Sequence, residues 1–517
     1  MITFPLVKKY LSRKKEMIMK KKKYYIGLDQ GTTGTTTLLL DEKWNIVSRG
    51  YREHRQHYPK PGWVEHDPLE LWQRVTESMN MALELAGATA DQIKCIGIDN
   101  QGETVMLWDK VTGAPLYNAI VWQDRRMARY ADELTKEHGE LIREKTGLMA
   151  DSYFSGPKIK WIIDNVDGVR DKINQGRVLA GTIDSWLIWK MTHGKVHVTD
   201  CSTASRTMMF NIHTGRWDED ILDILGIPKS ILPEICDSAM IYGYTDPLDF
   251  FGARIPISGS VVDQQAALFG QACFSQGNIK CTYGTGCFML MNTGDKAVYS
   301  KNGLLTTVAW RLNRKMSFAL DGGIYITGAA TQWLRDGIKI IDNAAQTEEM
   351  AYAAGGNGGV YFVPAFSGLA APHWDSYARG TMVGITGGTT REHIVRATLE
   401  STAYQVKDNL DVMNMDSGMP VTILRADGGA AANNFLMQFQ ADLLGIPVDV
   451  PVIKDTTALG AAQLAALGAG EFDSIEQLEG NWKLARRYEP KMSIDERETL
   501  LYNWHRAVER AKSWSEE

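Results

Sequence analysis

The sequence predicts an α/β protein built from two large lobes. The chain has 517 residues, 44% hydrophobic and 23% charged, which is an ordinary globular composition but too long for a single core. Strand-like runs alternate with stretches of helical periodicity. Glycine-containing turns follow apolar runs near both ends of the chain and in its middle. These observations favour one lobe over residues 24–272, a second over residues 273–517, and a ligand between them.

Charge and cysteine content narrow the functional classes. The formal net charge is −6, so no global basic field is available to hold a nucleic acid or an anionic membrane. The six cysteines form no CxxC pair, which argues against a zinc site or a disulfide framework and favours the reducing cytoplasm. Every apolar run falls well short of the roughly 18 residues that a membrane-spanning helix needs. Small molecules are therefore the expected partners, with no nucleic acid and no membrane.

Residues 1–23 form a separate basic arm. Lysines and arginines crowd ahead of the first strand-like run, and no apolar segment of a secretory signal follows them. The arm could bind RNA or a membrane surface. We favour a disordered arm or a mis-assigned start, with Met17 or Met19 as the true first residue.

The first lobe is expected to open with a β-hairpin. Residues 24–29 are apolar and read as a buried strand, residues 30–34 as a tight polar turn, and residues 35–40 as a second strand. A similar pattern recurs where residues 280–286 run into the apolar residues 287–291. It recurs again where the run 424–429 precedes a helix-prone segment, 430–443. Helical periodicity is clearest over residues 68–86, 124–135, 326–341, 391–413 and 475–483.

The turn at residues 29–34 has the chemistry of a phosphate site. Glycine permits close backbone approach, N–H groups and the Thr32 and Thr33 hydroxyls can donate to phosphate, and Asp29 can hold Mg²⁺ through water. Thr285, between two glycines, has similar chemistry. An ordinary hairpin would also use these residues. The sequence contains neither a Walker A nor a Rossmann pattern, so a nucleotide would have to lie between two lobes.

Asp263 is the candidate catalytic base. It follows the apolar run 255–262 and precedes the helix-prone residues 264–270, so its side chain should emerge at a strand-to-helix junction. A helix-capping role would give the same pattern.

Two spaced motifs and several shorter segments are family signatures. Residues 153–165 are similar to the first signature of the FGGY carbohydrate kinases, and residues 380–400 to the second. More specific segments lie at residues 58–67, 116–123, 263–268, 282–293 and 427–435. With these segments the chain resembles the glycerol kinases of that family from residue 24 to about residue 490.

The resemblance implies a fold and a set of site residues. The fold would be two ribonuclease-H-like lobes of the actin-like ATPase type, closing over ATP and Mg²⁺. Asp263 would be the base and Asp29 would support the metal. The nucleotide would be held by Thr32, Thr33, Gly34, Thr285, Gly328, Gln332, Gly429 and Asn433. The acceptor alcohol would contact Gly102, Glu103, Trp122, Tyr153, Asp263, Gln264 and Phe288. Trp122 and Phe288 could equally belong to the core, and Glu103 could pair with a surface lysine.

Three positions depart from the glycerol kinase pattern. Gly34 replaces a serine and Thr36 an arginine on the nucleotide side, which could weaken ATP binding. Gly102 replaces an arginine that donates to substrate hydroxyls, a loss of about 1.5 to 3 kcal/mol for a charge-assisted hydrogen bond. Glycine should also leave more room. We therefore expect weaker glycerol binding and admission of a longer acceptor.

These patterns favour an ATP-dependent kinase acting on a terminal hydroxyl of a small polyol, with glycerol as the default acceptor. The first alternative is a kinase for a C4 to C6 polyol or ketose, such as erythritol, threitol, xylitol or xylulose. The second is an actin-like or chaperone-like ATPase that phosphorylates no small molecule. The resemblance also implies a homo-oligomer, because dimers and tetramers are both common among such kinases.

Overall fold

The computed structural model describes residues 22–375 and 377–516. Almost all of the basic arm expected over residues 1–23 lies outside the described residues. Across these two ranges, none of the helices combines the length and the apolar character that crossing a membrane requires.

The first half of the chain forms a six-stranded sheet with the strand order β13-β14-β5-β1-β2-β3. The expected hairpin is present as antiparallel β1 and β2, and β5 and β14 extend the sheet in parallel with β1. The strands are β1 Tyr24–Gln30, β2 Gly34–Asp41, β3 Ile46–Glu53, β5 Ile93–Asn100, β13 Ala239–Tyr244 and β14 Pro256–Val262.

The second half forms a seven-stranded sheet with the order β17-β18-β16-β15-β21-β22-β23. Its central part repeats the first sheet, because three antiparallel strands (β18, β16, β15) are followed by two strands parallel to β15 (β21, β22). The strands are β15 Ile279–Tyr283, β16 Cys287–Gly294, β17 Leu305–Leu312, β18 Lys315–Ile324, β21 Leu424–Asp427, β22 Val448–Pro451 and β23 Leu484–Tyr488. This repeated strand arrangement explains why the strand-and-turn pattern recurs in the sequence.

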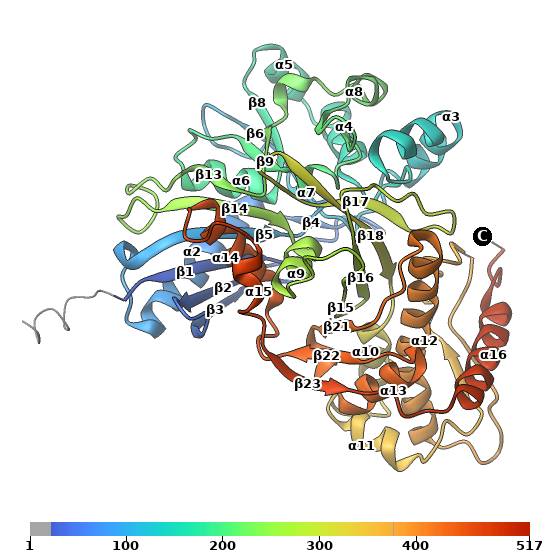
Figure 1. The fold of residues 1–517 in the computed structure, drawn as a ribbon. Helices are drawn as coiled ribbons and strands as arrows, with labels where there is room; N and C mark the ends of the chain where they lie inside the picture. The colour runs from blue at the N-terminus through green and yellow to red at the C-terminus, as the bar shows by residue number, and fades with distance from the viewer. Residues whose placement is uncertain (1–21, 376, 517) are drawn as a thin grey trace, which may run out of the picture.

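Two helices lie between the sheets (Figure 1): α9 Asp263–Gly270 and α14 Thr456–Gly468. Helix α14 packs on β1, β5 and β14, and α9 packs on α14 and on β15 and β16. The approach of α14 is very close, because a Cβ on Gly27 would lie 1.9 Å from the Ala458 carbonyl oxygen. A Cβ on Gly97 would lie 1.9 Å from the Ala461 oxygen. Glycine is therefore required at both positions.

The two faces of the first sheet are covered by different helices. Helix α2 Pro68–Ala86 packs on β2 and β3, and the Thr37 hydroxyl lies 2.8 Å from that of Ser78 on α2. The residues of β1 and β2 that alternate with this face point toward α14 instead. Asp29 and Thr36, which are paired across β1 and β2, lie on the α14 side, facing the second half of the chain.

The remaining elements surround these two sheets. A four-stranded sheet has the order β4-β7-β6-β8, with β4 Glu65–His66, β6 Val105–Asp109, β7 Ala119–Ile120 and β8 Val178–Thr182. Three two-stranded sheets pair β9 Val198–Asp200 with β12 Glu234–Cys236, β10 Phe210–Asn211 with β11 Arg216–Trp217, and β19 Tyr361–Val363 with β20 Thr381–Val383. The other helices are α3 Ala128–Thr146, α4 Ser155–Asn165, α5 Val169–Asn174, α6 Ile183–Met191, α7 Cys201–Ala204, α8 Glu219–Leu225, α10 Gly328–Asp336, α11 Gln346–Ala353, α12 Arg391–Ser417, α13 Asn434–Leu444, α15 Glu476–Glu479 and α16 Ile494–Ala511. The 3₁₀ turns are Ala90–Gln92, Lys229–Ile231 and Gly429–Ala432.

The helix expected over residues 68–86 is confirmed, and that over 391–413 continues to Ser417. The predicted start at residue 124 is wrong, because α3 begins at Ala128. Asp124 is buried and engaged elsewhere. Its carboxylate accepts from the Val64 N–H at 2.7 Å and from Arg126 Nε at 2.9 Å. The segment before Ala128 therefore forms a buried ion pair instead of a first helical turn.

Three other predicted helices are shorter than expected. Helix α10 starts at Gly328 and not at residue 326, because the N–H groups of Gly328 and Ala329 donate to the carbonyls of Gly284 and Thr285. Helix α15 ends at Glu479, since the chain then turns into β23. The segment 430–443 is divided into a 3₁₀ turn and α13, with the Asn433 side chain capping the latter.

Candidate active site

Acidic side chains gather where three parallel strands end. Asp29 on β1 is paired with Asp99 on β5, and Val262, the last residue of β14, is paired with Asn100. Asp263 follows directly as the first residue of α9, which is the strand-to-helix junction expected from the sequence. Glu103 lies just beyond the end of β5. The carboxyl ends of adjacent parallel strands are a common place for ligand sites in α/β folds.

Glu103 is held by a buried arginine. Arg206 Nε donates to Glu103 Oε1 at 2.7 Å, and Arg206 Nη1 lies 3.0 Å from Asp321 Oδ2 on β18. All three side chains are almost fully buried. The alternative in which Glu103 pairs with a surface lysine is therefore wrong. The Arg206 guanidinium bridges the two halves of the chain, since Asp321 belongs to the second sheet.

Aromatic side chains connect the Glu103–Arg206 ion pair to the turn at residues 29–34. The Tyr153 ring centre lies 5.9 Å from Arg206 Cζ, and the Trp122 and Tyr153 rings meet edge to face at 5.7 Å. Trp122 Nε1 donates to Thr32 Oγ1 at 2.9 Å. The structure thus brings Glu103, Trp122 and Tyr153 into one group that ends at the turn.

Asp263 begins a second group. Its Oδ1 accepts from the Gln264 N–H at 2.7 Å. The side-chain carbonyl of Gln264 accepts from Lys280 Nζ at 2.5 Å, and Lys280 Nζ also donates to the Phe288 carbonyl at 3.3 Å. Lys280 is fully buried, so it places a cation beneath this group. Because the side-chain carbonyl of Gln264 accepts this hydrogen bond, its NH₂ group remains available to donate to a ligand.

The surroundings raise the pKa of Asp263 to about 7. Burial is the main cause, the negative charges of Glu103 and Asp29 add to it, and the positive charge of Lys280 opposes it. A carboxylate with a pKa near neutral pH is well suited to accept a proton in catalysis. The contributions of Glu103 and Asp29 place both carboxylates within electrostatic reach of Asp263.

The expectation that Gly102 leaves extra room is wrong, because even the Cβ atom of a side chain at this position would be crowded. A Cβ on Gly102 would lie 2.5 Å from Val262 Cγ2 and 3.6 Å from Arg206 Cγ. Gly102 is not among the glycines with positive φ, so this crowding, and not backbone conformation, explains the glycine. The isopropyl group of Val262 fills the space where a side chain at position 102 would begin.

The turn at residues 29–34, expected to bind phosphate, is tight and partly open. The Gly31 N–H donates to the Gly34 carbonyl at 3.0 Å, which closes the loop that carries Thr32 and Thr33. Thr33 is exposed, and Thr32 is partly exposed. Thr33 is therefore accessible, whereas Thr32 Oγ1 already accepts from Trp122 Nε1.

The turn at residues 283–286 packs against the start of α10 and against the turn at residues 427–429. A Cβ on Gly328 would lie 2.4 Å from the Gly284 carbonyl oxygen, beside Thr285. A Cβ on Gly428 would lie 2.5 Å from the Tyr283 carbonyl oxygen. No atom lies within 4 Å of the corresponding point on Gly429, so this side of the turn is open. Thr285, Gly328 and Gly429 are thus brought together by the backbone.

Two of the expected nucleotide residues, Gln332 and Asn433, lie in the second half of the chain, on α10 and at the start of α13. Gln332 is exposed on α10. The Asn433 side chain accepts from the Leu436 N–H at 3.0 Å and donates to Thr347 Oγ1 at 3.1 Å, so both of its ends are engaged within the second lobe.

Family models decide the identity of the fold. The N-terminal domain of the FGGY family of carbohydrate kinases matches residues 24–270, and its C-terminal domain matches residues 279–469. The chain belongs to the FGGY family of carbohydrate kinases. It is an α/β phosphotransferase of two actin-like lobes, as the sequence predicted.

Individual relatives of this FGGY kinase are similar over nearly their whole length. "Glycerol kinase 2" of Thermotoga maritima is 59% identical over 493 residues, covering 95% of this chain and 99% of the relative. A glycerol kinase of Caldanaerobacter subterraneus is 57% identical, covering 96% and 100%. The crystal structure of Plasmodium falciparum glycerol kinase with ADP is 39% identical, with a TM-score of 0.88 and coverage of 95% and 98%. A xylulose kinase from Rhodospirillum rubrum, 22% identical with a TM-score of 0.81, shares the fold.

The carboxylates at the strand ends of this FGGY kinase are chemically suited to a divalent cation. Asp99 is fully buried, and no donor among the described residues reaches either of its oxygens. Burial, followed by the charges of Asp29 and Asp263, raises the pKa of Asp99 well above its usual value. A nearby cation would relieve this unpaired burial. No group of three or more His, Cys, Asp or Glu side chains that could hold a metal ion is found in the described ranges.

Sequence reasoning missed four charged members of this region: Asp99, Arg206, Lys280 and Asp321. Arg206 and Lys280 had a usable signal. Each is the single cation in a stretch that is otherwise uncharged, Arg206 within residues 201–215 and Lys280 within residues 264–294. Long charged side chains are almost never fully buried unless paired, so a lone cation in an apolar strand indicates a buried partner.

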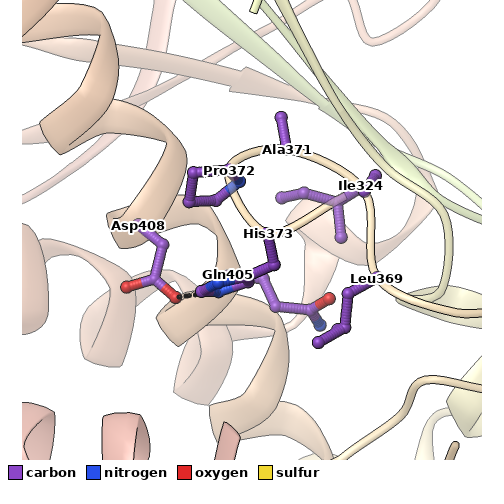
Figure 2. Close-up of a pocket in the computed structure, with 8 residues that line it drawn as sticks. Ile324, Leu369, Ala371, Pro372, His373, Gln405 and Asp408 are labelled. Atoms are coloured by element: carbon purple, nitrogen blue, oxygen red, sulfur yellow. Dashed lines mark ion pairs between the residues drawn. The ribbon is translucent and has the colours of Figure 1, made fainter. Parts of the chain in front are cut away.

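A small cavity lies between the end of β18, the loop at Leu369–His373 and helix α12 (Figure 2). Its volume is about 10 Å³, which is room for about one water molecule. His373 Nε2 lies 3.7 Å from Asp408 Oδ2 at its edge, and Asp408 also accepts from His505 and Trp504. The cavity is too small for a substrate.

Proposed function

We propose that this chain is an ATP-dependent kinase that phosphorylates a terminal hydroxyl of glycerol. Relatives named glycerol kinases, 54–59% identical over nearly the full chain, support this assignment. The observation that carries it is the place of Asp263 at the junction of β14 and α9, next to the strand end that carries Asp29, where burial raises its pKa to about 7. A proton acceptor at that place is what phosphoryl transfer to an alcohol requires.

The acceptor would lie against Asp263. Its attacking hydroxyl gives a proton to the Asp263 carboxylate, the oxygen forms a bond to the γ-phosphorus, and the bond from that phosphorus to the β-phosphate oxygen breaks to release ADP. Glu103 accepts from a second hydroxyl. Trp122 and Tyr153 cover the C–H face of the polyol, and the NH₂ of Gln264 donates to an oxygen.

The nucleotide would span the turns. Thr32, Thr33, Gly34 and Thr285 are proposed for the phosphates, because the two threonines of the first turn are accessible and the backbone around Thr285 is tightly closed. Gly328, Gln332, Gly429 and Asn433 are proposed for the adenosine end. Mg²⁺ would be held near Asp29 and would neutralise charge on the phosphates.

The structure offers no observation that favours a larger acceptor. That expectation rested on vacant space at Gly102, and Val262 begins to fill this space. A screen of ADP release over C3 to C6 polyols and ketoses, ranked by kcat/KM, tests the assignment. We expect glycerol to rank first. A C4 or C5 polyol or a ketose with a kcat/KM tenfold above that of glycerol would refute it.

Location and assembly follow as secondary proposals. The six cysteines are unpaired and buried, which suits a reducing cytoplasm, where ATP is also available. Edge strand β13 exposes Met240, Ile241 and Tyr244, a surface that a homo-oligomer could cover. Mass photometry at two concentrations would distinguish a dimer or tetramer from a monomer.

A further inference from the structure

Two departures from the glycerol kinase pattern, Gly34 and Thr36, lie beside the first phosphate turn. At each of them the structure places a side chain of β3. Thr36 Oγ1 accepts from Arg49 Nη2 at 3.2 Å. The Tyr51 hydroxyl lies 2.7 Å from the point that a Cβ on Gly34 would occupy. The cation and the hydroxyl absent from β2 are therefore present on its neighbour.

These side chains share the face that carries the site. Asp29 is paired with Thr36 across β1 and β2, and Thr36 is paired with Tyr51 across β2 and β3. Side chains directly opposite each other in a sheet lie on the same face, and so do residues two apart on one strand. Arg49 and Tyr51 therefore lie in line with Asp29, on the side covered by α14. Gly50, between them, faces α2.

Arg49 remains accessible in this position. Its side chain is 44% exposed, its Cζ lies 5.3 Å from the Tyr51 ring centre, and its Nε lies 3.3 Å from Asp455 Oδ1 at the start of α14. The guanidinium is held at Nε by Asp455 and at Nη2 by Thr36, which leaves the Nη1 donors to reach a phosphate. Burial raises the pKa of Asp29, and the positive charge of Arg49 is one of the effects that oppose this rise.

We propose that Arg49 and Tyr51 form a phosphate-binding pair for the polyphosphate of the nucleoside triphosphate. Arg49 supplies the charge in place of an arginine at position 36, and Tyr51 supplies the hydroxyl in place of a serine at position 34. This inference rests on the proposed kinase function and assigns phosphate contacts to a strand that none of the family motifs includes.

Nucleotide binding without any acceptor tests the pair. Isothermal titration with a magnesium-bound, non-hydrolysable ATP analogue is compared with titration of adenosine, which has no phosphate. Because a hydrogen bond to a charged group is worth about 1.5 to 3 kcal/mol, Arg49→Ala should weaken analogue binding by about tenfold or more. Tyr51→Phe should weaken it by about threefold or more, and Arg49→Lys less than Arg49→Ala. Adenosine affinity should stay within about twofold throughout.

Arg52→Ala is the matched control. It removes the same charge from the same strand, but Arg52 points the other way, to Met81 and to Glu77 on α2. Analogue binding in this variant should stay within about twofold of the wild-type value. Adding Thr36→Arg to Arg49→Ala should restore most of the lost affinity, since the two positions are adjacent.

Three results would overturn the proposal that Arg49 and Tyr51 bind phosphate. Unchanged analogue binding by Arg49→Ala would show that Arg49 only joins β3 to Asp455, in which case thermal stability alone would fall. An equal loss of adenosine affinity would place the effect away from the phosphates. An equal loss in Arg52→Ala would make it a general effect of charge. Failure of the wild-type protein to bind either the ATP analogue or adenosine would instead refute the proposed kinase function.

Discussion

Placing an arginine at position 102 should require a second change at Val262. In Gly102→Arg the new Cβ would lie 2.5 Å from Val262 Cγ2, where ordinary contacts between carbon atoms are about 3.5 to 4 Å. Overpacking of this kind typically costs about 1 to 3 kcal/mol, and Val262 is 2% exposed and cannot move far. The single variant is expected to lose thermal stability and to bind glycerol no better than the wild type.

Val262→Ala removes the obstructing methyl group. In Gly102→Arg/Val262→Ala we expect the guanidinium to reach the acceptor, where the carboxylates of Glu103, Asp263 and Asp321 provide compensating charge. A charge-assisted hydrogen bond of about 1.5 to 3 kcal/mol should lower KM for glycerol by about tenfold or more relative to the wild type. The added positive charge should also lower the pKa of Asp263 and move the acid limb of the pH profile downward.

Steady-state kinetics on the four members of this cycle, with thermal unfolding alongside, measures the coupling. The control pairs Gly102→Arg with Val261→Ala, because Val261 is equally buried but lies on the opposite face of β14. We expect no recovery in that control. Additive effects of the two substitutions on both KM and stability, or equal recovery with Val261→Ala, would refute the reasoning.

Three other predictions follow from the charged clusters. Asp263→Asn should lower kcat by about 10² to 10⁴ fold, and wild-type kcat/KM should rise with pH through about 7 as this carboxyl ionises. Since its folded pKa is raised from 3.8, Asp263 binds its proton more tightly in the folded state, so Asp263→Asn should gain stability over the wild type between pH 4 and 7 and hold that gain above pH 7. A wild-type kcat/KM that does not change with pH around 7, or a stability difference between Asp263→Asn and the wild type that does not change between pH 4 and 7, would contradict these expectations. Arg206→Ala should cost about 3 to 5 kcal/mol of stability, because it leaves buried carboxylates unpaired, and full retention of the melting temperature would be inconsistent with the ion pairs described. Asp408→Asn should destabilise the protein most near pH 5 to 6. Hydrogen bonds lower the pKa of the wild-type Asp408 carboxyl from 3.8 despite its burial. The hydrogen bond between Asp408 and His505 raises the pKa of His505 from 6.5. The Asp408 contribution is lost as pH falls and the His505 contribution as pH rises, so a melting-temperature difference that is constant from pH 5 to 9 would contradict it.

Local patterns predicted much of the fold. The hairpin β1–β2, the strand before Asp263 and helix α2 depend on residues close in sequence, and all three are confirmed. The start of α3 could not be predicted in this way, because Asp124 is engaged by Val64, 60 residues earlier. Tertiary contacts override local helical preference at such points.

The site was less predictable than the fold for the same reason. The position of Asp263 follows from its strand and helix. The partner of Glu103 is Arg206, 103 residues away, and Asp321 completes that ion pair from the other lobe. The wall beside Gly102 is made by Val262 on another strand. A residue missing from a motif can be judged only with the side chain that fills its space.

Identification of the phosphorylated product tests the central proposal most directly. The purified protein is incubated with MgATP and glycerol, and ³¹P NMR follows ADP and phosphate ester together. We expect one glycerol phosphate for each ADP formed, with Asp263→Asn forming neither at a comparable rate. ADP production that continues unchanged without glycerol and yields only inorganic phosphate would contradict the account.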